Sequence, residues 1–209
     1  MSSVASIYQR SPGDVRAFAR GYVEQLAITL SALDFDAVMR CIDRLDRARR
    51  EERTVFVIGN GGSASTASHM ANDLLSLTNK CGNVSPAFRI VALTDNMALF
   101  SAIANDDGYE HVFVRQLATL FRSGDMLISI SASGNSPNLL EAARWVRANA
   151  GTNIGLLGFD GGALLKLCDD AIVVRTAKGE YGFVEDAHLV MDHLMTNWFQ
   201  QHLQSATEA

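Results

Sequence analysis

Residues 55–63 read VFVIGNGGS, and residues 128–136 read ISISASGNS. Each stretch is a short apolar run that ends in a cluster of Gly, Ser and Asn, and an amphipathic pattern begins within a few residues. Glycines let the backbone approach a ligand closely, and the free N–H groups at the start of a helix attract anions. Two strand–loop–helix units of this kind predict one pocket for a phosphorylated small molecule.

Apolar runs alternate with amphipathic segments along the rest of the chain. The pattern predicts strands at 54–58, 88–93, 126–130, 153–159 and 171–175, and helices at 65–77, 96–103, 110–121, 137–148, 161–167 and 184–203. Continuous apolar strands between helices are typical of a parallel sheet that is covered on both faces. We therefore expect an α/β fold with a doubly wound, five-stranded parallel sheet in three layers. Ligands bind beyond the carboxyl ends of the strands in such sheets.

The first 53 residues precede this alternation. Residues 1–13 are predicted to be a frayed start that closes with the turn Pro12-Gly13. Apolar residues keep helical spacing from Val15 to Leu33, and a second helical pattern begins at Phe35. Each helix has an apolar stripe that must pack on the sheet or on another subunit. We expect residues 1–53 to be a helical segment of the same domain that serves in oligomerisation, and residues 54–209 to bind the ligand.

Composition narrows the class of protein. A net charge of −5 argues against nonspecific binding to nucleic acid, which needs basic patches. The three cysteines show no CxxC spacing, which is typical of free thiols in a reducing compartment. No apolar run approaches the roughly 20 residues of a membrane span, and the start does not resemble a signal peptide. We expect a cytoplasmic protein whose partners are neither nucleic acid nor membrane.

The two loops differ from the common nucleotide-binding motifs. The pattern GxxxxGK[ST] is absent from the chain, and the first loop is not GxGxxG, so neither a nucleoside triphosphate nor a dinucleotide is indicated. Ser133 and Ser136 could direct their hydroxyls at an anion just before a helix that begins with Pro137. The alternative is that both loops are ordinary turns capped by Ser and Asn.

Histidines and carboxylates recur on two predicted helices. His69 and Asp73 are four residues apart and therefore share a helix face. On the last helix, Glu185 and His193 diverge by about 80° and can reach one side, whereas His188 lies on the other side of Glu185. If the two helices converge, the four residues suit a divalent ion such as Zn²⁺, and equally a proton shuttle. The alternative is that they are polar residues on helix surfaces.

The ordered motifs at 59–63, 69–73, 130–136 and 185–193 together resemble the sugar isomerase (SIS) family. The closest branch is that of the phosphoheptose isomerases, and the resemblance runs from about Thr54 to about Gln201. It implies isomerisation of sedoheptulose 7-phosphate to D-glycero-D-manno-heptose 7-phosphate, or a related heptose phosphate, through an enediol. It also implies a homotetramer with active sites at subunit interfaces.

The resemblance implies roles for single residues. The sugar phosphate would bind to Asn60, Gly61, Gly62, Ser63, Asp106, Ser131, Ser133 and Ser136. The catalytic residues would be Asp73, His193 and Glu185, with His193 and one of the two carboxylates as the acid–base pair. A divalent metal, Zn²⁺ in metal-bound members, would be held by His69, Asp73, Glu185 and His193.

The chain departs from the family pattern at its proposed centre. Asp73 stands where the family has Glu, Glu185 where it has Gln, Ala132 where it has Thr, and Gly182 where it has Asp. The shorter Asp73 and the added charge of Glu185 could compensate for each other. These departures keep open a second hypothesis, in which the chain is a non-catalytic SIS protein that binds a phosphosugar or a regulatory partner. An isomerase or epimerase of amino-sugar phosphates is a third.

Overall fold

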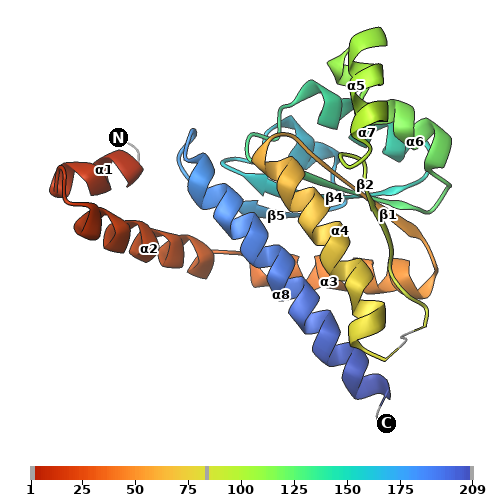
Figure 1. Ribbon diagram of the computed structural model, residues 1–209, viewed down its shortest axis with the longest axis horizontal. Helices are drawn as coiled ribbons and strands as arrows, with labels where there is room; N and C mark the ends of the chain where they lie inside the picture. Colours follow the sequence, from red (N-terminus) through yellow and green to blue (C-terminus); the bar gives the residue numbers. More distant parts are fainter. Residues whose placement is uncertain (1–2, 83–84, 208–209) are drawn as a thin grey trace.

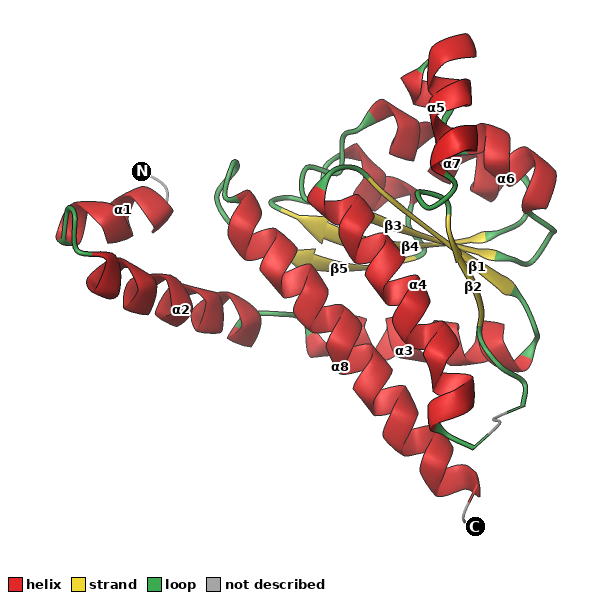
Figure 2. Cartoon of the chain, in the orientation of Figure 1, coloured by secondary structure: helices red, strands yellow, loops and turns green. Residues whose placement is uncertain are grey.

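A five-stranded parallel sheet forms the middle layer of the fold (Figures 1 and 2). The computed structural model describes residues 3–82 and 85–207. The strands are β1 (Thr54–Gly59), β2 (Arg89–Ala92), β3 (Met126–Ser131), β4 (Thr152–Gly158) and β5 (Asp170–Val174). Their order is β2-β1-β3-β4-β5, and every pair is parallel. The predicted α/β fold is confirmed. The strand order reverses between β1 and β3, and such a reversal opens a crevice at the carboxyl ends of the strands.

Helices cover both faces of the sheet. One face carries α3 (Phe35–Arg50), α4 (Gly62–Lys80) and α8 (Tyr181–Thr207). The other carries α5 (Met97–Asp106), α6 (Val114–Leu120), α7 (Pro137–Ala148) and two short 3₁₀ helices, η1 (Tyr109–His111) and η2 (Ala163–Leu167). Side chains alternate between the faces along β1, so that Val55 and Val57 join the first core and Phe56 and Ile58 the second. This double burial explains the continuous apolar strands of the sequence.

The helices α4 and α8 lie side by side and run in the same direction (Figure 1). Buried apolar residues of α8 recur every three or four positions and pack in the core against the sheet: Val184, Ala187, Met191, Met195, Phe199 and Leu203. Near the far end of the pair, the Cys81 thiol lies 3.7 Å from the Gln200 carbonyl oxygen. Both helices start at the carboxyl edge of the sheet, so their facing sides extend the crevice.

The prediction of a frayed start was wrong for the described residues from Ser3 onward. They form a helix, α1 (Ser3–Arg10), because Ile7 finds a buried place against Gly21 of the next helix. The Ser3 N–H also donates a hydrogen bond to the carboxylate of Glu180, just before α8. The residues that hold this helix in place, Gly21 and Glu180, lie outside the first 13 residues, so the local sequence pattern did not indicate them.

The helix α2 (Val15–Ser31) confirms the first predicted helix and projects away from the sheet (Figure 1). It begins after Asp14, whose carboxylate accepts hydrogen bonds from the Arg16 and Ala17 N–H groups. Its contact with the body runs through Tyr22, which stacks on Phe183 and donates a hydrogen bond to Asp186 at 2.8 Å. Much of its apolar surface, including Val23 and Ile28, is exposed.

Element bounds differ from the predictions on both faces, and on the first face α4 and α8 extend at both ends beyond the predicted 65–77 and 184–203. The predicted helix 110–121 is divided into η1 and α6, because Val112 and Phe113 between them are both fully buried and the chain bends to insert them into the core.

In the described part of the chain, no helix combines the length and the apolar character that crossing a membrane requires. All three cysteines are free, as predicted, and burial raises the pKa values of Cys41 and Cys168 to about 12.

Candidate active site

A cavity of about 200 Å³ lies where the loops after β1 and β3 meet the start of α8. It is lined by five residues of the predicted substrate set, Asn60, Ser63, Ser131, Ser133 and Ser136. Ile130, Ala132, Leu139, Tyr181 and Glu185 complete the wall. The two loops that are 70 residues apart in the sequence therefore form one polar cavity at the expected edge of the sheet.

The serine loop keeps its hydroxyl groups available to a ligand. The Ser131 hydroxyl accepts a hydrogen bond from the Gly134 N–H at 3.0 Å and retains its own proton for donation. Ser136 is the N-cap residue of α7, yet within the described chain its side chain makes no capping hydrogen bond. Gly134 has a φ of +61°, and a Cβ there would lie 2.0 Å from the Gly161 carbonyl oxygen. Only glycine fits this turn, which aims the serines at the cavity.

A reciprocal pair of amides joins the two loops. The Asn60 Nδ2 donates to Asn138 Oδ1 at 3.0 Å, and the Asn138 Nδ2 donates to Asn60 Oδ1 at 2.9 Å. The Tyr109 hydroxyl also donates to Asn60 Oδ1, at 3.0 Å. Asn138 is fully buried at the start of α7, so it fixes Asn60 against the serine loop. Neither Asn138 nor Tyr109 was predicted, because their role depends on contacts between distant segments.

Replacing Asn138 with alanine is expected to lower the free energy of unfolding by about 1–3 kcal/mol, since it removes a buried amide that exchanges two hydrogen bonds with Asn60. The same variant should raise the KM for the substrate, because Asn60 is no longer held. Tyr109→Phe is the matched control: it removes a single hydrogen bond from a half-exposed ring and should cost about 1 kcal/mol or less. Urea unfolding curves check both values. Equal stability of Asn138→Ala and the unmodified protein would contradict this role.

Glu185 lies in the cavity, next to the first turn of α4. A Cβ on Gly62 would lie 2.6 Å from Glu185 Oε2, so the glycine makes room for this carboxylate.

Gly61 lines an adjoining cavity of about 250 Å³ that shares Asn60 with the first. Among the described residues that line either cavity, Asp106 is not found; its carboxylate accepts a hydrogen bond from Asn105 at 2.7 Å. Its assignment to the substrate site stays a prediction.

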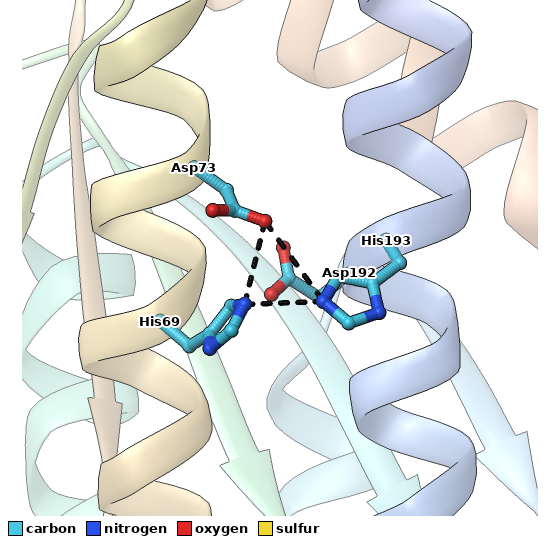
Figure 3. Close-up of side chains that lie close together, drawn as sticks. All are labelled: His69, Asp73, Asp192 and His193. Carbon is cyan, nitrogen blue, oxygen red and sulfur yellow. Dashed lines mark hydrogen bonds and ion pairs between the residues drawn. The ribbon is translucent and has the colours of Figure 1, made fainter.

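A second polar group lies further along the α4–α8 pair, and Figure 3 shows its side chains pointing toward one another. His69 Nε2 is 3.1 Å from His193 Nε2 and 3.4 Å from Asp73 Oδ2. His193 Nε2 is 4.0 Å from the same Asp73 oxygen. Three of the four residues predicted for the metal centre are thus brought together, while the fourth, Glu185, lines the cavity between the two loops instead.

Asp192 is the unpredicted member of this group. One ligand atom from each of His69, Asp73, Asp192 and His193 lies within 4.8 Å of every other. Asp192 is fully buried, and burial together with the negative charge of Asp73 raises its pKa to about 6. One signal could have revealed it: Asp192 falls within the apolar stripe of α8, where a buried charge requires a partner.

The donor set fits a divalent metal. Two imidazoles and two carboxylates are ligands that zinc takes, and ligand atoms about 2.0–2.2 Å from a tetrahedral zinc lie roughly 3.3–3.5 Å apart. The distances from His69 Nε2 to His193 Nε2 and to Asp73 Oδ2, 3.1 Å and 3.4 Å, are close to this spacing, and the third distance, from His193 Nε2 to Asp73 Oδ2, is longer at 4.0 Å. The two imidazole Nε2 atoms face each other, as two ligands of one ion do.

His188 is excluded from this group by its position. It is fully buried on the sheet side of α8, and burial lowers its pKa to about 4, although the main chain of Leu157 favours the charged form. The sequence had placed it on the other side of Glu185, in agreement with this position. His188 therefore belongs to the core as a neutral side chain.

Comparison with known proteins agrees with this geometry. A model of the SIS domain matches residues 21–158, more than half of the chain. The chain belongs to the SIS domain family. The matched SIS region includes the β1 and β3 loops and His69 and Asp73, and it ends before α8. The predicted family resemblance is confirmed.

Several relatives within the SIS family are phosphoheptose isomerases. One from Bradyrhizobium sp. strain BTAi1 is 37% identical over 154 residues, which are 74% of this chain and 75% of that protein. One from Nitratiruptor sp. is 37% identical over 161 residues, 77% of this chain and 81% of that protein. The structure of a phosphoheptose isomerase from Francisella tularensis superimposes with a TM-score of 0.77 and 26% identity, covering 91% of this chain and 98% of that one.

Proposed function

We propose that this SIS protein is an aldose–ketose isomerase that converts sedoheptulose 7-phosphate to D-glycero-D-manno-heptose 7-phosphate or a related heptose phosphate. The names of its relatives support this substrate. The observation that carries the proposal is the shared cavity, in which a serine loop for the phosphate and the carboxylate of Glu185 line one space.

The phosphate end of the sugar is held by the loop after β3. The hydroxyls of Ser131, Ser133 and Ser136 donate to the phosphate oxygens, as hydroxyl groups near the start of α7 are suited to do. Asn60 and Ser63 bind sugar hydroxyls from the loop after β1. Anchoring one end of the chain fixes the reacting carbons at the other, which removes much of the entropic cost of the reaction.

Proton transfer is assigned to Glu185. In the direction from ketose to aldose, the base takes a proton from C1, the electron pair forms the C1–C2 double bond, and the C2 oxygen is protonated to give the enediol. Return of a proton to C2, with loss of the C1 hydroxyl proton, gives the aldehyde. Glu185 lines the cavity and is only half buried, so it can exchange protons with substrate and solvent.

The histidine cluster is assigned to a divalent metal, with zinc as the leading candidate. His69, Asp73 and His193 would hold it, and it would supply positive charge to stabilise the negative oxygen of the enediolate. While His69 and His193 bind an ion through Nε2, neither is a free base. The proton then falls to a carboxylate, which agrees with the role given to Glu185.

The oligomeric state is proposed to be a homotetramer with active sites completed at subunit interfaces. Support comes from α2, whose exposed side chains Val15, Val23 and Ile28 have relative exposures of 77%, 64% and 63%. An apolar helix that projects from its own chain requires a partner to cover it. The free thiols agree with a cytoplasmic location.

The test is turnover of sedoheptulose 7-phosphate in D₂O, followed by NMR, with added Zn²⁺ and with a chelator. We expect deuterium at the carbon next to the carbonyl, and a heptose 7-phosphate product, because the enediol exchanges its proton with solvent through the base. The chelator should slow the reaction if the metal takes part in it.

A different outcome would favour another function. Saturable binding of the sugar phosphate without exchange would favour the non-catalytic, phosphosugar-sensing alternative. Neither exchange nor binding would exclude this substrate, and amino-sugar phosphates would be tested next. Exchange and turnover that are indifferent to the chelator would retain the isomerase and remove the metal from the mechanism.

A further inference from the structure

We infer that Asp192, and not Glu185, is the second carboxylate ligand of the metal centre formed by His69, Asp73 and His193. The inference rests on the proposed metal and adds a ligand that neither the sequence motifs nor the relatives' names assign. It also separates two tasks within this chain, because it leaves Glu185 free for the sugar.

Asp192 is aimed into the cluster with one oxygen unpaired. The residue has no exposed surface, and Thr196 makes only a long contact of 3.5 Å with its Oδ1. Among the described residues, Oδ2 has no hydrogen-bonding partner. A buried carboxylate without a partner is costly in free energy, and coordination of a cation removes that cost. The unpaired oxygen is therefore available as a ligand atom for a cation.

The surrounding donors point to the same place. Figure 3 shows the Asp192 carboxylate between the two helices, with Asp73 and His69 reaching toward it from α4 and the His193 imidazole beside it on α8. All four donor atoms lie within 4.8 Å of one another, so a small movement of side chains would bring each to bonding distance of one ion. Two carboxylates and two neutral imidazoles give a charge of −2, which a divalent cation balances.

Glu185 is in a poor position to be that ligand. It comes seven residues before Asp192 on α8, which is roughly 10 Å along a helix. Its carboxylate packs against the first turn of α4 at Gly62, whereas His69 is two turns further on the same helix. Glu185 therefore lines the proposed sugar cavity, whereas Asp192 lies beside His69 and His193.

The experiment is a zinc titration of the purified protein against a chromophoric chelator, without substrate. We expect Asp192→Asn to weaken the affinity for Zn²⁺ by about 100-fold or more, because loss of an outer-shell partner alone typically costs 10–100-fold. Glu185→Gln should keep the affinity within a few-fold. Asp186→Asn is the matched control: it removes the same charge from the same helix, next to a tyrosine instead of a metal.

A second measurement guards against misfolding of the variant. Asp192→Asn without metal should melt at or above the temperature of the metal-free unmodified protein, since it removes an unpaired buried charge. Its melting temperature should then rise less on addition of Zn²⁺ than that of the unmodified protein. Co²⁺ substitution should give intense visible bands typical of tetrahedral sites in the unmodified protein, and weaker or shifted bands in Asp192→Asn.

Two results would overturn the inference in different ways. If Asp192→Asn binds zinc as tightly as the unmodified protein, or if Glu185→Gln weakens binding equally, then Asp192 is not the distinguishing ligand. If the unmodified protein binds no zinc and no Co²⁺, the metal itself is excluded. Turnover of the sugar phosphate in the presence of chelator is measured independently, so failure of the metal centre and failure of the isomerase function are distinguishable.

Discussion

Replacing Glu185 with glutamine is expected to lower kcat for the sugar phosphate by about 10²–10⁴-fold, the usual effect of losing a general base. The amide keeps the size of the side chain and its place beside Gly62, so KM should change little. The deuterium exchange at the carbon next to the carbonyl should fall in parallel with turnover, because both depend on the same proton transfer. Steady-state kinetics and NMR exchange measure the two effects.

Two controls separate this role from a structural one. Asp186→Asn changes the neighbouring carboxylate, which binds the Tyr22 hydroxyl, and should retain turnover. Asp73→Asn should lower both turnover and zinc affinity, since Asp73 contacts the two histidines. If Glu185→Gln turns over normally while Asp73→Asn does not exchange deuterium even when loaded with zinc, then Asp73 is the base and Glu185 only lines the cavity.

The fold followed from local pattern because its signals are local. Short apolar runs indicated every strand, and three of them, β1, β3 and β4, end in glycine or serine. The helix α7 was predicted with the same bounds as observed because Pro137 marks its start. The start of the chain was the exception. Ile7 and Ser3 are ordered by Gly21 and Glu180, and no pattern within the first 13 residues carries that information.

The site was predictable up to the point where distant helices must be docked. Periodicity put His69 with Asp73, and His193 on one side of α8, but the relative shift of the two helices decides which residues of α8 face them. In the structure, α4 and α8 are aligned so that His69 lies opposite His193 and Gly62 lies opposite Glu185. A search for charged residues within the apolar stripe of α8 would have indicated Asp192 and His188 as buried, whatever the shift.

Acid should destabilise the protein through His188. Its pKa is about 4 in the fold, whereas an exposed histidine has a pKa of about 6.5. Between these values the unfolded chain binds a proton that the folded chain does not, so stability falls as the pH is lowered. The stability that depends on a neutral His188 is fully present above pH 6.5, declines through pH 5, and is lost near pH 4. A difference of this size corresponds to about 3 kcal/mol.

Protonation of Asp192 changes the stability in the opposite direction, so its effect has to be separated from that of His188. Its folded pKa, about 6, lies above its ordinary value, so the folded state binds the extra proton and is stabilised as the pH falls through 6. The unmodified protein therefore shows the sum of two opposite slopes over the same range. The informative quantity is the difference in unfolding free energy between the unmodified protein and a variant of His188, because the contribution of Asp192 is common to both.

His188→Leu and His188→Gln serve this purpose together. Leucine preserves the apolar packing and glutamine preserves a polar side chain, but neither titrates. Both should differ in stability from the unmodified protein at pH 7, and both differences should shift in favour of the variant by about 3 kcal/mol on going to pH 4. Urea unfolding of the metal-free proteins at half-unit pH intervals measures the shift. Curves that remain parallel to that of the unmodified protein would mean that His188 is protonated equally in both states, and that its burial beside the sheet does not hold it neutral.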